Sequence, residues 1–361
     1  HRAHQALYTH HLLESTDSDW GICEVNLMPG NDRVLIENLK KQQLLYTVAE
    51  KGAESTELKI IGSMKEALHP EIDGCEGILN AMARPQTAIV SLTVTEKGYC
   101  ADAASGQLDL NNPLIKHDLE NPTAPKSAIG YIVEALRLRR EKGLKAFTVM
   151  SCDNVRENGH VAKVAVLGLA QARDPQLAAW IEENVTFPCT MVDRIVPAAT
   201  PETLQEIADQ LGVYDPCAIA CEPFRQWVIE DNFVNGRPDW DKVGAQFVAD
   251  VVPFEMMKLR MLNGSHSFLA YLGYLGGYET IADTMTNPDY RKAAFALMMQ
   301  EQAPTLSMPE GTDLNAYATL LIERFSNPSL RHRTWQIAMD GSQKLPQRML
   351  DSVRWHRVHQ K

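Results

Sequence analysis

SAIGYIVEALRLRREKGLKAFTVMSCDN, residues 127–154, contains a helix signal followed at once by a strand signal. Its first part, 127–143, places apolar side chains at i, i+3, i+4 and i+7, has basic residues in its last turn, and closes on Gly143, which fits the position after a helix. Its second part, 144–154, is an apolar, β-rich run that ends in polar residues. Such a run is typical of a strand covered on both faces, so the stretch predicts a helix leading into a buried strand.

The same alternation continues on both sides of this stretch. The predicted strands are 21–27, 44–50, 58–64, 87–94 and 144–154, and the predicted helices are 32–43, 76–84, 127–143 and 160–171. Alternating strands and helices, with polar residues after the strands, predict a doubly wound α/β fold of the Rossmann type. In that fold, ligands bind beyond the carboxyl ends of the strands.

From about residue 240 onward the pattern becomes helical. Helical spacing without intervening strands marks AQFVADV (245–251), FEMMKLRML (254–262), SFLAYLGYLGGYETIADTM (267–285), YRKAAFALMMQE (290–301) and LNAYATLLIERF (314–325). Residues 196–240 are mixed and leave the secondary structure open. We therefore predict a Rossmann-type nucleotide-binding domain over 1–245 and an α-helical substrate and catalytic domain over 246–361.

Composition excludes several classes of protein. The 361 residues are 45% hydrophobic and 22% charged, with a formal net charge of −11. An acidic balance argues against a nucleic-acid binder, because phosphate contact requires a basic face. No apolar run approaches the roughly 20 residues of a membrane span, and no signal-peptide pattern opens the chain, so we expect a cytoplasmic protein.

Cysteine and histidine spacing does not predict a metal site. The seven cysteines are scattered, and Cys217 and Cys221 form C-x3-C without a second pair, so we expect reduced, mostly buried thiols and no zinc. Four histidines fall within the first eleven residues, where an i, i+3 pair is weak evidence for ligands.

KLRMLNGSH, residues 258–266, brings three chemically suited side chains close together. A lysine that loses its proton acts as a general base, and the amide of an asparagine donates to an alkoxide or carbonyl oxygen. An imidazole adds a further hydrogen-bonding group. These groups are the minimum set for oxidising an alcohol without a metal.

The spacing also indicates how these side chains are arranged. At about 100° per residue, Glu255, Lys258 and His266 share one face of a helix. Asn263 lies at the margin of that face. The Asn-Gly pair could instead end the helix, with the following serine capping the next one. The plain alternative is a solvated helix face with a turn.

Seven stretches occur in the order in which one known family has them. They are HRAHQ (1–5), LYTV (45–48), TVTEKGY (93–99), SCDNVRENG (151–159), FPCTMVDRIVP (187–197), FEMMKLRMLNGSH (254–266) and DGSQKLP (340–346). On these stretches the chain resembles the mannitol dehydrogenase family of polyol-specific long-chain dehydrogenases. The resemblance implies a zinc-independent, NAD-dependent secondary-alcohol dehydrogenase. It implies D-mannonate and D-fructuronate as the substrate pair, with tagaturonate/altronate and mannitol/fructose as alternatives.

The resemblance implies catalytic roles for individual residues. Lys258 matches the general base of the family. Asn154 and Asn263 match two amides that hold the reacting oxygen, although the context of Asn154 also suits a turn after a strand. His266 matches a histidine that positions the substrate.

Two carboxylates match acidic residues near the base. Asp193 lies in MVDR, and alone it would suit a surface or helix-capping position. Glu255 matches a carboxylate that carries protons between the lysine and solvent. Its charge favours the protonated lysine, which opposes the effect of burial.

Cofactor contacts are implied for the ends of the predicted strands. The matching residues are His1, Arg2, Asp32, Thr95, Glu96 and Asn154. The family has a strand and a G-x-G-x-F phosphate turn directly before His1, and the printed sequence lacks both. A carboxylate at Asp32 would accept from the adenosine ribose and favour NAD over NADP, or it could be an ordinary helix N-cap.

A sugar-acid substrate requires a cation for its carboxylate. Arg331, Arg333 and Lys344 flank or lie in DGSQK and are the predicted groups. Family members that act on neutral polyols have an arginine where this chain has Gln336. A non-catalytic sugar-acid sensor, or a truncated and inactive fragment, on the same fold is the alternative from another class. We expect a monomer or weak oligomer.

Overall fold

The computed structural model describes residues 1–359, which divide into two compact units. The α/β unit consists of His1–Ala49, Leu58–Cys221 and Arg225–Val251. The helical unit consists of the described chain from Val252 onward together with two earlier segments, Glu50–Glu57 and Glu222–Phe224. The predicted fold class, a Rossmann-type α/β part followed by a helical part, is confirmed. The predicted domain boundary near residue 245 stays a prediction.

Parallel strand pairs form the frame of the α/β unit. β5 (Ile89–Leu92) pairs with β6 (Thr148–Ser151), and β1 (Ile22–Val25) pairs with β4 (Met64–Leu68). Two three-stranded groups accompany these pairs. One has the order β3 (Thr56–Ile61), β2 (Tyr46–Lys51), β8 (Ile219–Cys221). The other has the order β10 (Gln246–Val248), β9 (Gln226–Glu230), β7 (Thr190–Asp193), and in it β7 is antiparallel to β9. Because β5 and β6 are parallel and in register, the residues that follow both strands emerge at the same edge.

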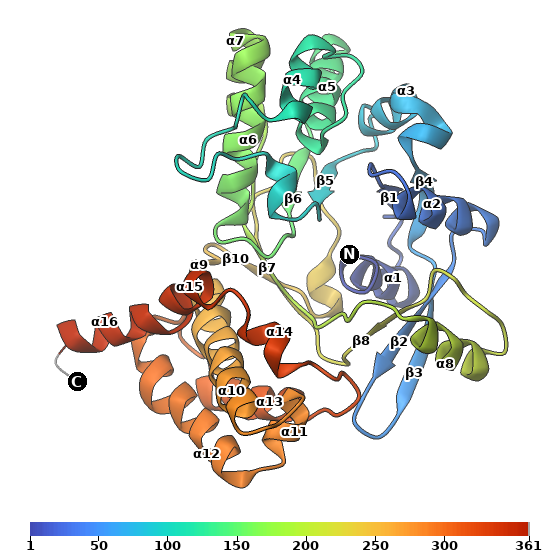
Figure 1. The fold of residues 1–361 in the computed structure, drawn as a ribbon. Helices are drawn as coiled ribbons and strands as arrows, with labels where there is room; N and C mark the ends of the chain where they lie inside the picture. The colour runs from blue at the N-terminus through green and yellow to red at the C-terminus, as the bar shows by residue number, and fades with distance from the viewer. Residues whose placement is uncertain (360–361) are drawn as a thin grey trace. The chain divides into compact units, whose positions relative to one another are not determined.

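Helices connect and cover these strands. They are α1 (Gln5–Ser15), α2 (Asn31–Lys41), α3 (Pro70–Met82), α4 (Pro113–Glu120), α5 (Ala128–Glu141), α6 (Asn158–Arg173), α7 (Pro175–Asn184) and α8 (Pro201–Leu211), with short 3-10 turns at η1 (Glu96–Tyr99) and η2 (Trp240–Val243). Figure 1 shows α5, α6 and α7 side by side. α5 begins where the sequence predicts it, because the Ser127 hydroxyl accepts from the Gly130 amide at 2.9 Å and caps the helix.

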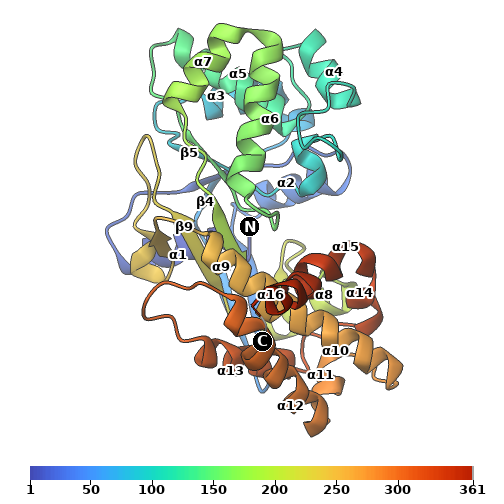
Figure 2. The same ribbon diagram turned by 90° about the vertical axis from the view of Figure 1, so that its left-hand side faces the viewer.

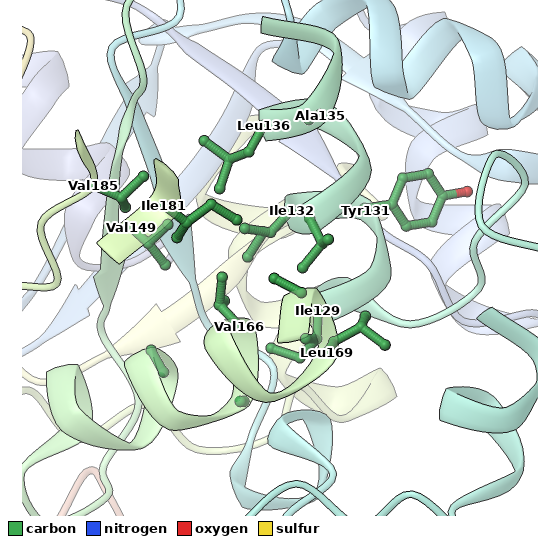
Figure 3. Close-up of a cluster of buried hydrophobic side chains, with 14 of the residues drawn as sticks. Ile129, Tyr131, Ile132, Ala135, Leu136, Val149, Val166, Leu169, Ile181 and Val185 are labelled. Carbon is green, nitrogen blue, oxygen red and sulfur yellow. The ribbon is translucent and has the colours of Figure 1, made fainter. Parts of the chain in front are cut away.

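The largest apolar core lies between these helices and β6. Ile132 of α5, Val149 of β6 and Val166 of α6 are 1%, 0% and 0% exposed. Their side chains face one another in Figure 3, with Ile181 of α7 beside them. Residues 146–153 of the continuous apolar run are therefore buried on both faces, as predicted, and this packing fixes the end of β6 that precedes Asn154.

Two predicted elements of the α/β unit differ from the structure. The segment 58–64, predicted as one strand, spans the end of β3 and the first residue of β4. The segment 245–251, predicted as helical, contains the strand β10, which pairs in parallel with β9. Tertiary packing overrides the helical spacing there, because Phe247 packs edge-on against Phe233 and carries Arg237 over its ring.

The helical unit is built from short helices and three π-helical segments. The helices are α9 (Val252–Met257), α10 (Gly264–Leu275), α11 (Ile281–Met285), α12 (Pro288–Ala296), α13 (Leu314–Phe325), α14 (Thr334–Ala338), α15 (Gly341–Leu345) and α16 (Asp351–Val358). The π-helices of the described residues are η3 (Lys258–Asn263), η4 (Leu297–Gln302) and η6 (Pro346–Leu350), and η5 (Ala303–Thr305) is a 3-10 turn. Figure 2 shows α10 beside α12. The predicted helical run 267–285 is interrupted after α10, where Gly277 has φ +83°.

A buried ion pair ties an early segment into the helical unit. Arg324 donates to both carboxylate oxygens of Glu222, at 3.1 and 2.7 Å, and its guanidinium lies 4.0 Å from the centre of the Phe224 ring. Nearby, Asn327 donates to the carbonyl oxygen of Lys51 at 3.0 Å. Two segments that precede Val252 in the sequence are thus integral parts of the helical unit.

The seven cysteines are free thiols, and five of them are buried, in agreement with the prediction. Among the described residues, no group of three or more His, Cys, Asp or Glu side chains is arranged to hold a metal ion. Every helix in residues 1–359 is too short or too polar to span a lipid bilayer.

Candidate active site

The helix that carries Lys258 changes its hydrogen-bonding pattern at that residue. α9 ends at Met257, η3 runs to Asn263, and α10 begins at Gly264 without a break. Gly264 has φ −61° and ψ −50°, so the predicted version with one continuous helical segment is confirmed and the version in which the Asn-Gly pair ends the helix is wrong. The glycine serves a close approach instead, because a methyl group there would lie 2.8 Å from the carbonyl oxygen of Arg348.

The π-helical turn brings Lys258 and Asn263 to the same side of the helix. In an α-helix, residues five positions apart are separated by about 140°, because each residue advances about 100°. In a π-helix the hydrogen bonds connect residues i and i+5, so residues five positions apart become neighbours. Asn263 therefore lies closer to Lys258 than α-helical spacing predicts. Lys258 is 9% exposed, and Glu255, one turn earlier in α9, is half-buried.

His266 lies in the first turn of α10 and is held by aromatic contacts. Its ring stacks on Phe325 with 5.3 Å between centroids and 5° between planes, and the His332 ring lies 5.4 Å away. Burial, followed by His332 and nearby cations, lowers the pKa of His266 to about 3. The imidazole is therefore neutral near pH 7, and it offers one donor and one acceptor nitrogen.

Positive charge gathers beside His266. Lys344 and Arg348, one helical turn apart in the segment α15–η6, both act on the charge state of that histidine. Burial lowers the pKa of Lys344, and the neighbouring Arg348 lowers it further. Arg348 donates to the Ser267 hydroxyl at 3.0 Å, and its Nε is buried without a hydrogen-bond partner. Of the three predicted carboxylate-binding residues, the structure thus brings Lys344 to the His266 region.

Arg331 and Arg333 line a different hollow of the helical unit. This cleft of about 260 Å³ also contains Glu279 and Asp283. Arg333 donates to the Glu279 carboxylate at 2.9 Å and is exposed, with 52% of its side-chain surface accessible. Two carboxylates in the cleft offset much of its positive charge, which makes it a poorer place for an anionic group than the surroundings of Lys344.

In the α/β unit, Asp153 joins the two strand ends that carry predicted site residues. Its carboxylate accepts from the backbone amides of Thr95 at 2.8 Å and Val94 at 3.2 Å, and from the Tyr99 hydroxyl. Burial raises the pKa of Tyr99, and the Asp153 charge raises it further, so the hydroxyl keeps its proton and donates. Thr95 is held at φ +63°, which is rare for a β-branched residue. Thr95 and the exposed Asn154 therefore emerge at one edge.

A buried amide side chain aligns β6 with β7. The Asn158 side chain donates to the carbonyl oxygens of Ser151 at 3.1 Å and Thr190 at 3.0 Å, and it accepts from the Thr190 amide at 2.9 Å. β7 ends at Asp193, which is 4% exposed. The predicted acidic residue is therefore the last residue of a strand whose position relative to β6 is fixed by hydrogen bonds.

The other predicted cofactor residues lie at the amino end of the chain and after β1. Asp32 is in the first turn of α2, and its carboxylate accepts from the Met28 amide at 3.1 Å. The N-cap of α2 is Gly30, so the alternative prediction that Asp32 is the N-cap is wrong. His1 pairs with Glu24 at 2.6 Å, and Arg2 donates to the Cys217 carbonyl oxygen at 2.6 Å. Glu96 begins η1 directly after Thr95 and is exposed.

Sequence reasoning missed three residues that shape these surroundings. Asp153 adjoins the predicted Asn154, and an acid at the end of a buried strand is a usable signal. Arg348 lies one turn after Lys344, which is also visible in the sequence. His332 lies between the two predicted arginines, and no spacing rule indicates that it, and not they, contacts His266.

Comparison with known proteins identifies relatives along the whole chain. The family models for the mannitol dehydrogenase Rossmann domain and the mannitol dehydrogenase C-terminal domain match residues 1–242 and 250–361. D-mannonate oxidoreductase of Escherichia coli K12 is 99% identical over 356 residues, which is 99% of this chain and 73% of that protein.

Two solved structures of relatives match the fold. A substrate-free D-sorbitol dehydrogenase is 40% identical with a TM-score of 0.96, and the match covers 100% of this chain and 74% of that one. The ternary complex of Pseudomonas fluorescens mannitol 2-dehydrogenase with NAD and D-mannitol is 41% identical with a TM-score of 0.88, covering 100% and 73%.

Proposed function

The chain belongs to the mannitol dehydrogenase family, and we propose on that premise that it interconverts D-mannonate and D-fructuronate with NAD. The family makes it a dehydrogenase of polyols or sugar acids. The substrate pair is supported by the 99% identity to a protein named D-mannonate oxidoreductase. NAD is supported by its presence in the mannitol 2-dehydrogenase complex.

Residues at the strand ends of the α/β unit fit this cofactor. Bound NAD supplies the acceptor for the hydride that leaves the alcohol carbon. The Asp32 carboxylate, in the first turn of the helix that follows β1, is suited to accept from ribose hydroxyls and to repel a 2′-phosphate. Thr95 and Glu96 follow β5 at the edge where Asn154 follows β6, and they would line the cofactor side of the site.

In the proposed mechanism Lys258 is the general base. Its amine takes the proton of the substrate hydroxyl as hydride leaves the carbon that bears this hydroxyl. In the reverse reaction the amine returns the proton. Glu255 passes that proton on to solvent, and Asp193 supplies a negative charge near the base. The observation that carries this mechanism is η3, which begins with the buried lysine and ends with an amide on the same side.

The amides of Asn154 and Asn263 are proposed to donate to the reacting oxygen. Such donors stabilise an alkoxide as it forms, because their dipoles are already oriented. His266 is proposed to hydrogen-bond the substrate as a neutral imidazole, consistent with its lowered pKa.

For the substrate carboxylate, we favour Lys344 among the predicted cations. Its charge lies near His266. Arg331 and Arg333 stay predictions, and the carboxylates that share their cleft weaken the case for them.

One side-by-side assay tests the proposal. NADH oxidation is followed with D-fructuronate, D-tagaturonate and D-fructose, and each reaction is repeated with NADPH. We expect the highest kcat/KM with fructuronate and NADH. A preference for tagaturonate or fructose would reassign the substrate within the family, and binding of the sugar acid without turnover would support a sensor.

A further inference from the structure

The three π-helices of the helical unit converge on one buried amide. Gln302, the last residue of η4, is 1% exposed. Its Nε2 donates to the carbonyl oxygen of Arg348 in η6 at 3.0 Å, and its Oε1 accepts from the Ser352 hydroxyl in α16 at 2.5 Å. Both polar atoms of the amide are therefore hydrogen-bonded to residues that lie 46 and 50 positions later in the sequence.

The same amide packs directly against the end of η3. Gly264 follows Asn263, and a methyl group at Gly264 would lie 2.9 Å from Gln302 Nε2 and 2.8 Å from the Arg348 oxygen. Such distances leave no room for a side chain. The backbone after η3 therefore packs directly against the two groups that form the Gln302–Arg348 hydrogen bond.

A second connection joins the same turn to the middle of η3. Arg260 donates to the carbonyl and hydroxyl oxygens of Thr305 at 3.0 and 2.9 Å, and the Thr305 hydroxyl donates to the Gln302 carbonyl at 2.7 Å. Residues 302–305 therefore contact η3 both within the π-helical turn and just after it.

Turns with i→i+5 hydrogen bonds are rare and occur mostly as local features at functional sites. We therefore expect contacts from neighbouring segments to stabilise the π-helical form of η3. Relaxation of η3 to α-helical geometry would rotate the residues after it by about 100° relative to Lys258, since one residue would be lost from the turn. Asn263 would then leave the lysine's side of the helix.

We propose that Gln302 is a positioning residue that holds η3 in its π-helical form and so keeps Asn263 beside Lys258. This inference rests on the proposed function. It assigns no contact between Gln302 and the substrate or cofactor. Its effect therefore appears in the chemical step and not in nucleotide binding.

The test compares Gln302→Leu with the wild type in the reduction of fructuronate. We expect kcat to fall at least tenfold while the Kd for NADH, from fluorescence titration, changes less than twofold. The isotope effect on kcat with NADH deuterated at the transferred hydrogen should rise, because misplacement slows hydride transfer itself. A kcat within twofold of the wild type, or an unchanged isotope effect, would overturn the inference.

Thr284→Ala is the matched control. Thr284 is fully buried in the same unit and donates to the Thr280 carbonyl oxygen at 3.0 Å, but its hydroxyl is bonded to none of the π-helices. It should lower the melting temperature and leave kcat and the isotope effect as in the wild type. If it reproduces the Gln302→Leu kinetics, general destabilisation explains both and the inference fails.

Gln302→Glu provides a second readout that does not depend on the folding of the leucine variant. An ionised carboxylate keeps the acceptor for Ser352 but faces the Arg348 carbonyl oxygen with no proton to donate. Protonation restores a donor, so the ratio of variant to wild-type kcat should rise as the pH falls. A pH-independent ratio contradicts the role of the Gln302–Arg348 bond. An inactive wild type would instead refute the proposed function.

Discussion

Lys258 is a charged residue type held almost entirely out of solvent at the point where a helix changes its pitch. Side chains of lysine are rarely buried unless they are paired or have a chemical task. Its neighbours in the sequence supply a carboxylate at Glu255 and an amide at Asn263. The chemistry proposed for this residue is therefore open to a direct kinetic test.

Replacing Lys258 with alanine should abolish most turnover. General bases contribute about 100- to 10,000-fold to rate, so we expect kcat to fall by about three orders of magnitude or more while NADH binds normally. Steady-state kinetics and NADH titration measure the two effects. Lys292→Ala, at an exposed lysine of α12, is the control and should keep full activity. Substantial turnover by the Lys258 variant would remove it from the role of base.

His266 should make the folded protein less stable in acid. Its pKa is lowered from 6.5 to about 3, so below pH 6.5 the unfolded chain binds a proton that the folded chain does not. Its contribution to stability is therefore lost as the pH falls from 6.5 toward 3. Urea unfolding at pH 7.5 and pH 5 should show a larger loss for the wild type than for His266→Asn. Equal losses would mean that the imidazole is protonated in the folded state.

Among the elements, η3 shows what spacing alone predicts and what it leaves open. Residues 254–262 have ordinary helical spacing, and the change from i→i+4 to i→i+5 hydrogen bonds leaves no mark in that pattern. α5 is predicted closely because its cap, its apolar stripe and its terminal glycine agree. β10 is not, since its state is set by pairing with β9. The chemistry of Lys258 is suggested by its neighbours in the sequence, and the role of Asn154 follows from family resemblance. Gln302 becomes visible only through its hydrogen bonds.

Gly264→Ala should disturb η3 more than a typical glycine substitution in a helix. The new methyl group would meet the Arg348 oxygen at 2.8 Å, and that oxygen belongs to the backbone, which cannot move aside easily. We expect a lower melting temperature and at least a tenfold loss of kcat. Gly77→Ala in α3 is the control, because its methyl group would lie 3.5 Å from the nearest atom. There alanine should be neutral or stabilising by up to about 1 kcal/mol. Equal behaviour of the two variants would contradict the close-packed arrangement at Gly264.

On the scale of the whole molecule, the two units do not correspond to two uninterrupted stretches of sequence. Glu50–Glu57 and Glu222–Phe224 precede the helical half of the chain but belong to its unit. The sequence predicts one change of pattern near residue 240 and gives no sign of this exchange. The reason is that both segments are short, and their assignment depends on contacts with residues about 100 or more positions away.

Breaking the buried pair at its glutamate should cost substantial stability. Glu222→Gln leaves the Arg324 charge buried without its carboxylate, a change that typically costs about 3–5 kcal/mol. Urea unfolding of this variant and of the double variant Glu222→Leu/Arg324→Leu gives the comparison. The double variant should be more stable than Glu222→Gln, because it removes the buried cation together with the carboxylate. If Glu222→Gln unfolds at the same urea concentration as the wild type, the ion pair contributes little to the free energy of unfolding.

The ion pair also has a consequence for chimeric enzymes. Recombining two relatives at residue 245 would take Arg324 from one parent and its carboxylate partner from the other. Hybrids made that way inherit a buried cation matched to a foreign segment. Grafts that carry residues 50–57 and 222–224 along with the helical half keep the original partners together, and they are the designs in which substrate preference could be transferred without a penalty in folding.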